Sequence, residues 1–301
     1  MKKSILLFCF SLTFSFSSIG QEWFTSFDVA KRMALAQNKM LFVIWDDALQ
    51  TPYYIEVNDE NGKKVLVDLT RHEEVNAIIW DYFIPLLMPE SEYGKLLDKA
   101  KNIRGTDYLS KLEDDSIKIM DVNGAILNSE FSLQTFENLP DLIKLYALNT
   151  SYLNPYLRNY LKKVNFTTTF ILASKYFDFA ILNTNQTRFD IVTLADGYLE
   201  EARILLEESD LDNKRAFLQK LEFFKIKELL ILNQPKKAKR LLKRIKVSEI
   251  AEINKELFVF LNYTTFMLLK DEVSAAPWKA KLSFINLKKA ELIIANKPGR
   301  S

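Results

Sequence analysis

Residues 40–53 read MLFVIWDDALQTPY, and this stretch decides the fold. The run from Met40 to Trp45 is continuously apolar and follows the helix-breaking pair Asn38-Lys39, which predicts a strand buried on both faces. Two aspartates then end the apolar run. The polar residues after Trp45 therefore lie at one end of the predicted sheet.

Strand and helix patterns alternate on both sides of this run, which predicts an α/β domain. The patterns predict helices over 26–38, 75–82 and 90–101, a β-hairpin with arms near 55–57 and 65–69, a strand over 83–88, and a second hairpin with arms 116–120 and 125–127. Pro85 has no N–H to donate to a neighbouring strand, so the strand that contains it is expected at an edge or a bulge.

From about residue 141 the apolar period becomes helical and remains so to the end of the chain. The predicted helices cover 141–148, 151–163, 167–182, 187–208, 212–232, 235–246, 249–270 and 278–295. Antiparallel helices of this length resemble tetratricopeptide-type repeats in shape, but neither the signature of those repeats nor a 34-residue period is present. The sequence thus predicts a domain boundary near residue 147, with domains over 21–147 and 148–301.

The first twenty residues have the pattern of a secretory signal peptide. Lys2 and Lys3 precede a mostly apolar run, and Ser18-Ile19-Gly20 supplies small residues at the cleavage position, so Gln21 is the expected mature N-terminus. Cys9 lies inside the apolar run behind Phe8, which is not the arrangement of a lipidated cysteine. No later stretch is apolar enough to predict a membrane span. The expected location is periplasmic or secreted.

The two predicted domains carry opposite charges. Residues 21–147 contain 22 acidic and 13 basic side chains, whereas residues 148–301 contain 17 acidic and 26 basic side chains. The net charges are therefore −9 and +9. Opposite signs predict either attraction between the two domains or a different partner for each domain.

Residues 23–147 resemble the thioredoxin-like superfamily in the order of their elements and in local motifs. Residues 23–39 resemble the helix that opens many exported members, and residues 43–50 align without gaps with the family's central strand and active-site approach. Residues 120–124, MDVNG, resemble a later strand and its turn. The family's Cys-Gly-Pro-Cys motif then corresponds to Gln50, Thr51, Pro52 and Tyr53. The resemblance implies a thioredoxin-like fold with an inserted hairpin over 53–70, followed by an all-α domain.

The departures from the family exclude its redox chemistry. That chemistry needs a cysteine thiolate and a second, resolving cysteine, and neither Gln50 nor Tyr53 can form or exchange a disulfide. The position of the family's buried acid is Ile44, and the position of its cis-proline falls near Asp115 or Ser116. Once the signal peptide is removed, the chain contains no cysteine. We therefore expect a domain that is redox-inactive.

Acidic residues from two loops are expected to meet at the former active-site end. They are Asp46, Asp47, Glu113, Asp114 and Asp115. Carboxylates from two loops can coordinate a hard cation such as calcium, although the spacing matches no loop motif, and a solvated acidic rim is the simpler interpretation. His72 is the sole histidine and lacks an identifiable catalytic partner, so we interpret it as an exposed residue at a helix end.

The segment 235–246 predicts a basic amphipathic helix. Ala238, Leu241, Leu242 and Ile245 form its apolar stripe, which leaves a set of cations on the outer faces. These cations are Lys237, Lys239, Arg240, Lys243, Arg244 and Lys246. A solvated face is one interpretation, and contact with an anionic surface is the other: a lipid head group, a polysaccharide, a protein or the chain's own acidic domain. Nucleic acid is not an expected partner of an exported protein.

The leading hypothesis is a non-catalytic exported binding protein that holds a protein or peptide partner and needs no cofactor. Thioredoxin-like folds have a groove for extended chain, and helical arrays present concave surfaces. A metal-dependent enzyme or cation-binding protein that uses the acidic loops is one alternative. An accessory protein of an envelope disulfide or folding pathway is the other.

Overall fold

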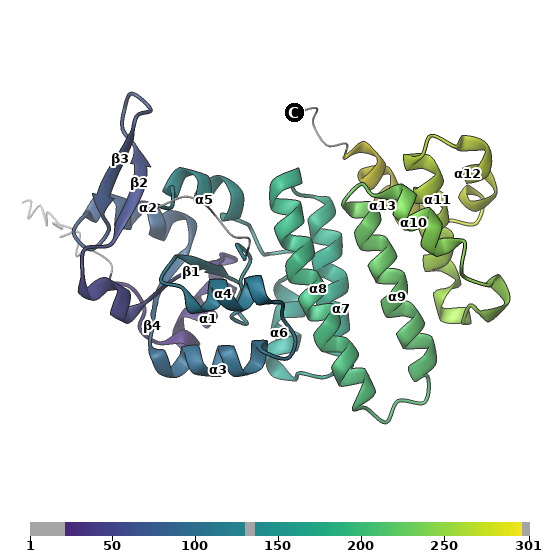
Figure 1. Cartoon of the computed structure of the whole chain (residues 1–301), viewed down its shortest axis with the longest axis horizontal. Coiled ribbons are helices and arrows are strands. Elements are labelled where there is room, and N and C mark those ends of the chain that lie inside the picture. The colour runs from purple at the N-terminus through teal and green to yellow at the C-terminus, as the bar shows by residue number, and fades with distance from the viewer. Residues whose placement is uncertain (1–21, 130–135, 297–301) are drawn as a thin grey trace, which may run out of the picture.

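The computed structural model describes residues 22–129 and 136–296, which form a mixed α/β part followed by a helical part (Figure 1). We call residues 22–147 the α/β part and residues 148–296 the helical part. Figure 1 shows the two parts side by side along the longest axis of the molecule. None of the helices in the described ranges is long and apolar enough to span a membrane.

The α/β part contains a central sheet, a separate hairpin and the helices that pack around them. Its elements are α1 (Phe27–Gln37), β1 (Leu41–Trp45), the 3₁₀ helix η1 (Asp46–Gln50), β2 (Tyr54–Asn58), β3 (Lys64–Asp68), α2 (Glu73–Tyr82), β4 (Ile84–Met88), α3 (Glu90–Ala100), α4 (Thr106–Glu113), β5 (Lys118–Met120) and α5 (Leu139–Tyr146). The mixed architecture and both predicted hairpins are confirmed, while α4 is a helix that the periodicity did not predict.

The central sheet has the strand order β4-β1-β5. β1 is buried along its whole length, as its continuous apolar run predicts, and pairs in parallel with β4 and antiparallel with β5. The chain returns from β5 through a turn at Gly124 (φ 82°), and Leu127 N–H donates to Ile119 O at 2.7 Å. Pro85 lies on the outer strand β4, which confirms the expected edge position.

The hairpin β2–β3 stands out from the α/β part as a separate two-stranded sheet (Figure 1). Its turn is stabilised by Asp59, whose Oδ1 accepts from Asn61 N–H and Lys63 N–H. Gly62 adopts φ 77°, a left-handed conformation that glycine takes without strain. Its base is tied to the rest of the part, because Glu56 N–H donates to Glu137 O at 2.9 Å.

The helical part is built around the long antiparallel pair α7 and α8. Its elements are α6 (Asn154–Lys162), α7 (Phe166–Ile181), α8 (Asn185–Glu207), α9 (Lys214–Ile231), α10 (Pro235–Leu242), the 3₁₀ turns η2 (Val247–Glu249) and η3 (Glu252–Asn254), α11 (Lys255–Leu268), α12 (Glu272–Lys279) and α13 (Phe284–Ala295). Phe223, Phe224, Phe258 and Phe260 are buried, as their helical spacing predicts.

Three predicted helices of this part are wrong in extent. The helix predicted over 249–270 begins only at Lys255, because Gln219 holds the preceding backbone in a non-helical path: it donates to Glu249 O and accepts from Ala251 N–H. Asn254 Nδ2 donates to Ala216 O of α9 and to Gln219 Oε1. The helix predicted over 278–295 is two helices, because Ser283 caps a new start by accepting from Asn286 N–H. The basic helix ends at Leu242 instead of 246.

A buried ion triad joins three helices of this part. Asp178 of α7 binds Lys227 of α9 at 2.8 Å and Lys289 of α13 at 2.7 Å. Burial acts to raise the pKa of Asp178, but the two ammonium groups outweigh it and lower that pKa below its usual value. The triad therefore fixes the packing of helices that lie far apart in the sequence.

Candidate functional site

The segment that follows β1 forms only a short 3₁₀ helix. η1 ends at Gln50, and Thr51 adopts an extended conformation instead of starting a longer helix. The α-helix that follows β1 in the chain, α2, begins only at Glu73, after the whole hairpin β2–β3. The hairpin β2–β3 therefore lies between residues 50–53 and the helix α2.

A groove of about 580 Å³ opens beside this segment. Its walls come from η1 and the residues after it, the base of the hairpin, the loop before β5 and the segment before α5. The lining residues are Asp47, Ala48, Thr51, Pro52, Tyr53, Tyr54, Asp115, Ser116, Phe136 and Glu137. Tyr54 is 49% exposed, so the hairpin borders the groove without filling it. Tyr53 donates from its hydroxyl to Asp115 O at 3.1 Å, and burial raises the pKa of this tyrosine far above its usual value.

A polar cluster lies at one wall of the groove. Lys111 Nζ donates to Ser116 Oγ at 2.5 Å and to Glu137 Oε1 at 3.3 Å. Ser116 in turn bonds Asp114 Oδ1, and Glu137 Oε2 accepts from Ile117 N–H at 2.8 Å. Lys111 therefore joins Ser116 and Glu137 through two donated hydrogen bonds. The cluster thus presents fixed donors and acceptors.

Lys118 is completely buried beneath this cluster. Its ammonium lies 4.8 Å from the centre of the Trp45 ring, donates to Asp114 O and pairs with Asp114 Oδ1 at 3.1 Å. Burial lowers the pKa of Lys118 to about 8, although Asp114 opposes the shift. Sequence reasoning missed this residue, since a lysine in a short strand is usually exposed.

The acidic residues meet as predicted, with one exception. Asp46, Asp47, Glu113 and Asp115 line a hollow of about 230 Å³ together with Glu90, over a floor that contains Trp45 and Tyr93. We call this site the acidic hollow. Asp114 is engaged elsewhere, by Ser116 and Lys118. Within 22–129 and 136–296, no three His, Cys, Asp or Glu side chains are arranged to hold a metal ion.

His72 occupies the N-cap position of α2, which agrees with a helix start. It is half-buried, whereas the sequence predicted an exposed residue. Its Nδ1 atom is buried and has no hydrogen-bond partner among the described residues. Within the described ranges, no acid or nucleophile is bonded to His72.

The basic helix α10 lines a second hollow, of about 660 Å³. Lys236, Lys239, Arg240 and Lys243 lie on one helical stripe and border this hollow with Leu269 and Asp271; we call it the basic groove. Lys239 is held by Asp271 at 3.9 Å and by the Phe266 ring at 5.0 Å.

The other cations of the segment lie outside the groove. Lys237 and Arg244 are exposed, and Lys246 lies beyond the end of α10 and pairs with Glu249 at 3.0 Å. Ala238 and Leu242 are buried, which confirms the apolar stripe. α10 packs on α9 and α11 at the end of the molecule away from the α/β part (Figure 1). The basic helix therefore does not contact the acidic α/β part of the same chain.

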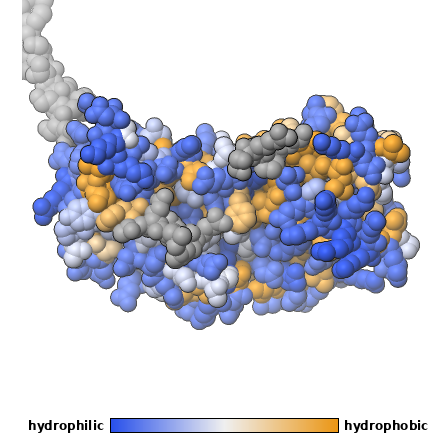
Figure 2. Space-filling model, turned by 45° about the horizontal axis from the view of Figure 1, so that its top comes forward, coloured by the Kyte–Doolittle hydropathy of each residue, from blue (hydrophilic) through white to orange (hydrophobic). Residues whose placement is uncertain are grey.

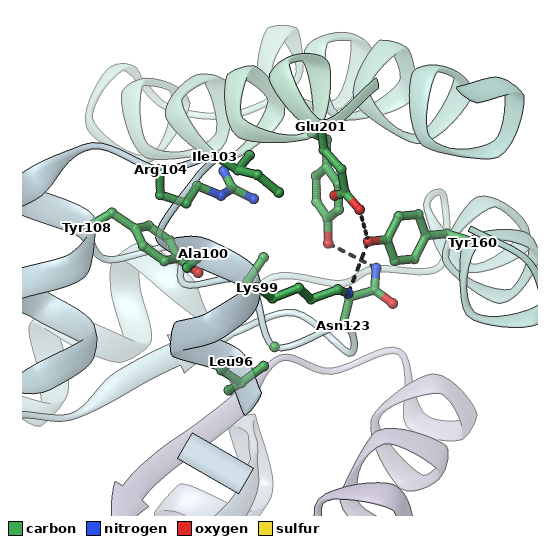
Figure 3. A pocket seen from close by; sticks show the side chains of 12 residues that line it. Leu96, Lys99, Ala100, Ile103, Arg104, Tyr108, Asn123, Tyr160 and Glu201 are labelled. Atoms are coloured by element: carbon green, nitrogen blue, oxygen red, sulfur yellow. Dashed lines mark hydrogen bonds between the residues drawn. The ribbon is translucent and has the colours of Figure 1, made fainter. Parts of the chain in front are cut away.

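The two parts meet through tyrosines. Asp121 is buried and its Oδ2 accepts from Tyr176 at 2.8 Å and from Tyr198 at 2.6 Å, although burial raises its pKa. Figure 3 shows the adjoining cavity, where Tyr160 donates to Glu201 at 2.7 Å and Lys99 donates to Tyr160 at 3.3 Å. With a volume of about 40 Å³, this cavity admits water but no organic ligand. It is a joint between the parts.

The open groove is the site best suited to an organic ligand of some size, because its volume lies in the typical range of about 300–1,000 Å³ and its walls combine apolar and polar groups. The basic groove is as large, but cations make up most of its lining. Of the predicted positions 50–53, Thr51, Pro52 and Tyr53 line the open groove, whereas Gln50 does not line it and donates to Asp47. Sequence reasoning missed the cluster of Lys111, Ser116 and Glu137, because Glu137 lies more than twenty residues after the other two. Comparison of the chain with protein-family models, curated proteins and solved structures gives no match.

Proposed function

We propose that this is an exported, non-catalytic binding protein whose open groove holds an extended peptide segment of a protein partner. The observation that carries the proposal is the groove itself: aromatic and proline walls stand beside fixed polar groups, at the position where a thiol would be needed for redox chemistry. Apolar walls with a few well-placed donors and acceptors are the usual composition of a recognition site.

The proposal includes membership of the α/β part in the thioredoxin-like superfamily. Two features support it: β1 and β4 are parallel strands joined through α2, and β5 lies antiparallel on the other side of β1. The return of the chain to Ile126 and then to α5 supplies the remaining hairpin and helix of that arrangement. The absence of cysteine from residues 21–301 makes this domain redox-inactive.

The polar cluster suits main-chain recognition. Ser116 and Glu137 line the groove from one wall, while Pro52, Tyr54 and Phe136 supply apolar contacts. An extended peptide presents N–H and C=O groups at regular intervals and side chains between them, so it needs both kinds of contact. The partner is thus expected to contribute an unstructured segment.

The test uses a displayed library of unstructured peptides and three proteins. Peptides selected on the wild type should bind Tyr54→Ala roughly tenfold more weakly in calorimetric titrations, the scale of losing an aromatic contact. Tyr82→Ala is the matched control, because Tyr82 is 46% exposed, similar to Tyr54, but lies on α2 outside the groove. The proposal fails if no peptide is selected, or if Tyr54→Ala binds as the wild type does.

Export has a separate test. We expect the protein purified from its native cells to begin at Gln21 and to be released with the periplasmic or culture fraction. N-terminal sequencing and cell fractionation check this. A mature chain that retains Met1 and stays with the cytoplasmic fraction would contradict the export proposal but leave peptide binding open to its own test.

A further inference from the structure

The opposite charges of the two parts are not neutralised within one chain. Every ion pair between described residues joins two side chains of the same part. The junction instead uses Asp121 with tyrosine hydroxyls, and the Arg104 guanidinium over the Tyr108 and Tyr198 rings. The remaining charge of each part is therefore available to another molecule.

The unpaired positive charge is concentrated in the basic groove. Lys236, Arg240 and Lys243 are exposed and form no ion pair with a described carboxylate. Their spacing of three and four residues places them on one face of α10, where their charges add. Asp271 compensates only Lys239.

The unpaired negative charge is concentrated in the acidic hollow. None of its five carboxylates forms an ion pair with a described cation. The Trp45 and Tyr93 rings lie at its floor, 4.6 Å apart between centroids, and aromatic faces also attract cations. The hollow thus has the composition of a receptor for lysine and arginine side chains.

Figure 1 shows α10 in the end of the molecule opposite the α/β part, so one chain cannot bring the two sites together. Figure 2 shows hydrophilic residues at both ends of the face in view, interspersed with apolar residues. We propose that copies of this chain associate head to tail, with the basic groove of one copy on the acidic hollow of the next.

Such a contact joins two different surfaces. It generates open chains, or closes into a ring or an antiparallel pair if the rotation between copies allows closure. The long side chains of Arg240 and Lys243 can reach into the acidic hollow of the neighbouring copy. Because the attraction is between exposed charges, association must weaken as salt is added.

The experiment is sedimentation velocity of the mature chain over a range of concentrations. At about 20 mM salt the wild type should form species larger than a monomer, and at about 300 mM salt the association constant should fall by roughly tenfold or more. Arg240→Glu/Lys243→Glu and, separately, Glu113→Lys/Asp115→Lys should each remain monomeric at low salt, because each variant then carries like charges on both surfaces.

Matched controls separate the surfaces from net charge. Lys237→Glu/Arg244→Glu changes the charge by the same amount, but places it outside the basic groove. Glu60→Lys/Asp81→Lys does the same for the acidic part, away from the hollow. Both controls should still associate.

An equimolar mixture of the two surface variants is the sharpest test. The reversed groove of one variant is complementary to the reversed hollow of the other, so the mixture should recover association that neither variant shows alone. A wild type that is monomeric at low salt, or a mixture that stays monomeric, overturns the proposal. Arg240 and Lys243 lie outside the open groove, so the Arg240→Glu/Lys243→Glu variant should still bind peptide whatever its association state, and the two proposals can fail separately.

Discussion

The guanidinium of Arg104 occupies the space above Gly197 of α8 in which any other residue would place its Cβ. Arg104 reaches across from the α/β part, donates to Leu194 O at 3.4 Å and lies over the rings of Tyr108 and Tyr198. A glycine in the middle of a long helix normally lowers helix stability, and here it makes room for the other part of the chain.

Gly197→Ala is therefore expected to destabilise the protein by about 1–3 kcal/mol, as overpacking does, even though alanine favours helices. Urea unfolding measures the change. Gly94→Ala is the control, because Gly94 lies in α3 with open space around it, and it should leave stability unchanged or raise it by up to about 1 kcal/mol. Equal stability of the two variants would contradict the role assigned to Arg104.

Tyr198→Phe should loosen the junction, because it removes a donor to the buried carboxylate of Asp121. The loss of a hydrogen bond to a charged group costs about 1.5–3 kcal/mol. Hydrogen exchange should show faster opening at Asn123 and Ala125, whose N–H groups also donate to Asp121. Tyr263→Phe is the control, since that buried tyrosine has no hydroxyl partner among the described residues and should unfold like the wild type.

Asp178→Ala leaves the ammonium groups of Lys227 and Lys289 without their carboxylate. Breaking a buried ion pair from one side typically costs about 3–5 kcal/mol, so the helical part should unfold at distinctly lower denaturant concentration. Asp98→Ala breaks an exposed pair with Lys101 and should change the free energy of unfolding by less than about 1 kcal/mol. Similar losses in the free energy of unfolding for both variants would show that the buried triad stabilises the fold no more than an exposed ion pair does.

Lys118 predicts a dependence of stability on alkaline pH. Its pKa in the folded chain is about 8, below the ordinary 10.5, so the folded chain binds fewer protons than the unfolded chain between these values. Its contribution to the free energy of unfolding therefore rises with pH over that window, by up to about 3 kcal/mol. Lys118→Met should remove this rise, as measured by denaturation at a series of pH values. The exposed Lys101→Met should retain it.

Features that depend on neighbours in the sequence could be predicted. The continuous apolar run of β1 predicted a strand buried on both faces, and the Asp59–Gly62 turn predicted the hairpin, because burial pattern and turn chemistry act locally. The edge position of the strand that contains Pro85 could be predicted because proline has no N–H to donate to a neighbouring strand.

Features that depend on contacts between residues far apart in the sequence could not be predicted. The 3₁₀ turns before α11 exist because Gln219, thirty or more residues earlier, bonds the backbone around Ala251. The burial of Lys118 depends on Trp45 and Asp114, and the junction depends on Tyr176 and Tyr198 meeting Asp121. The spacing of apolar residues along the sequence does not indicate which of these distant side chains contact one another.

The hairpin β2–β3 has a consequence for any attempt to build a reactive thiol at Gln50. A helix N-terminus directly behind a cysteine stabilises its thiolate, but the α-helix that follows Gln50 starts only at Glu73, beyond the hairpin. Gln50→Cys would place a thiol at the end of a short 3₁₀ helix, where its pKa should stay near the ordinary value of about 8.5. Gln50→Cys and Tyr53→Cys together would therefore supply two sulfur atoms without an activated thiolate, unless the hairpin between them and α2 were also removed.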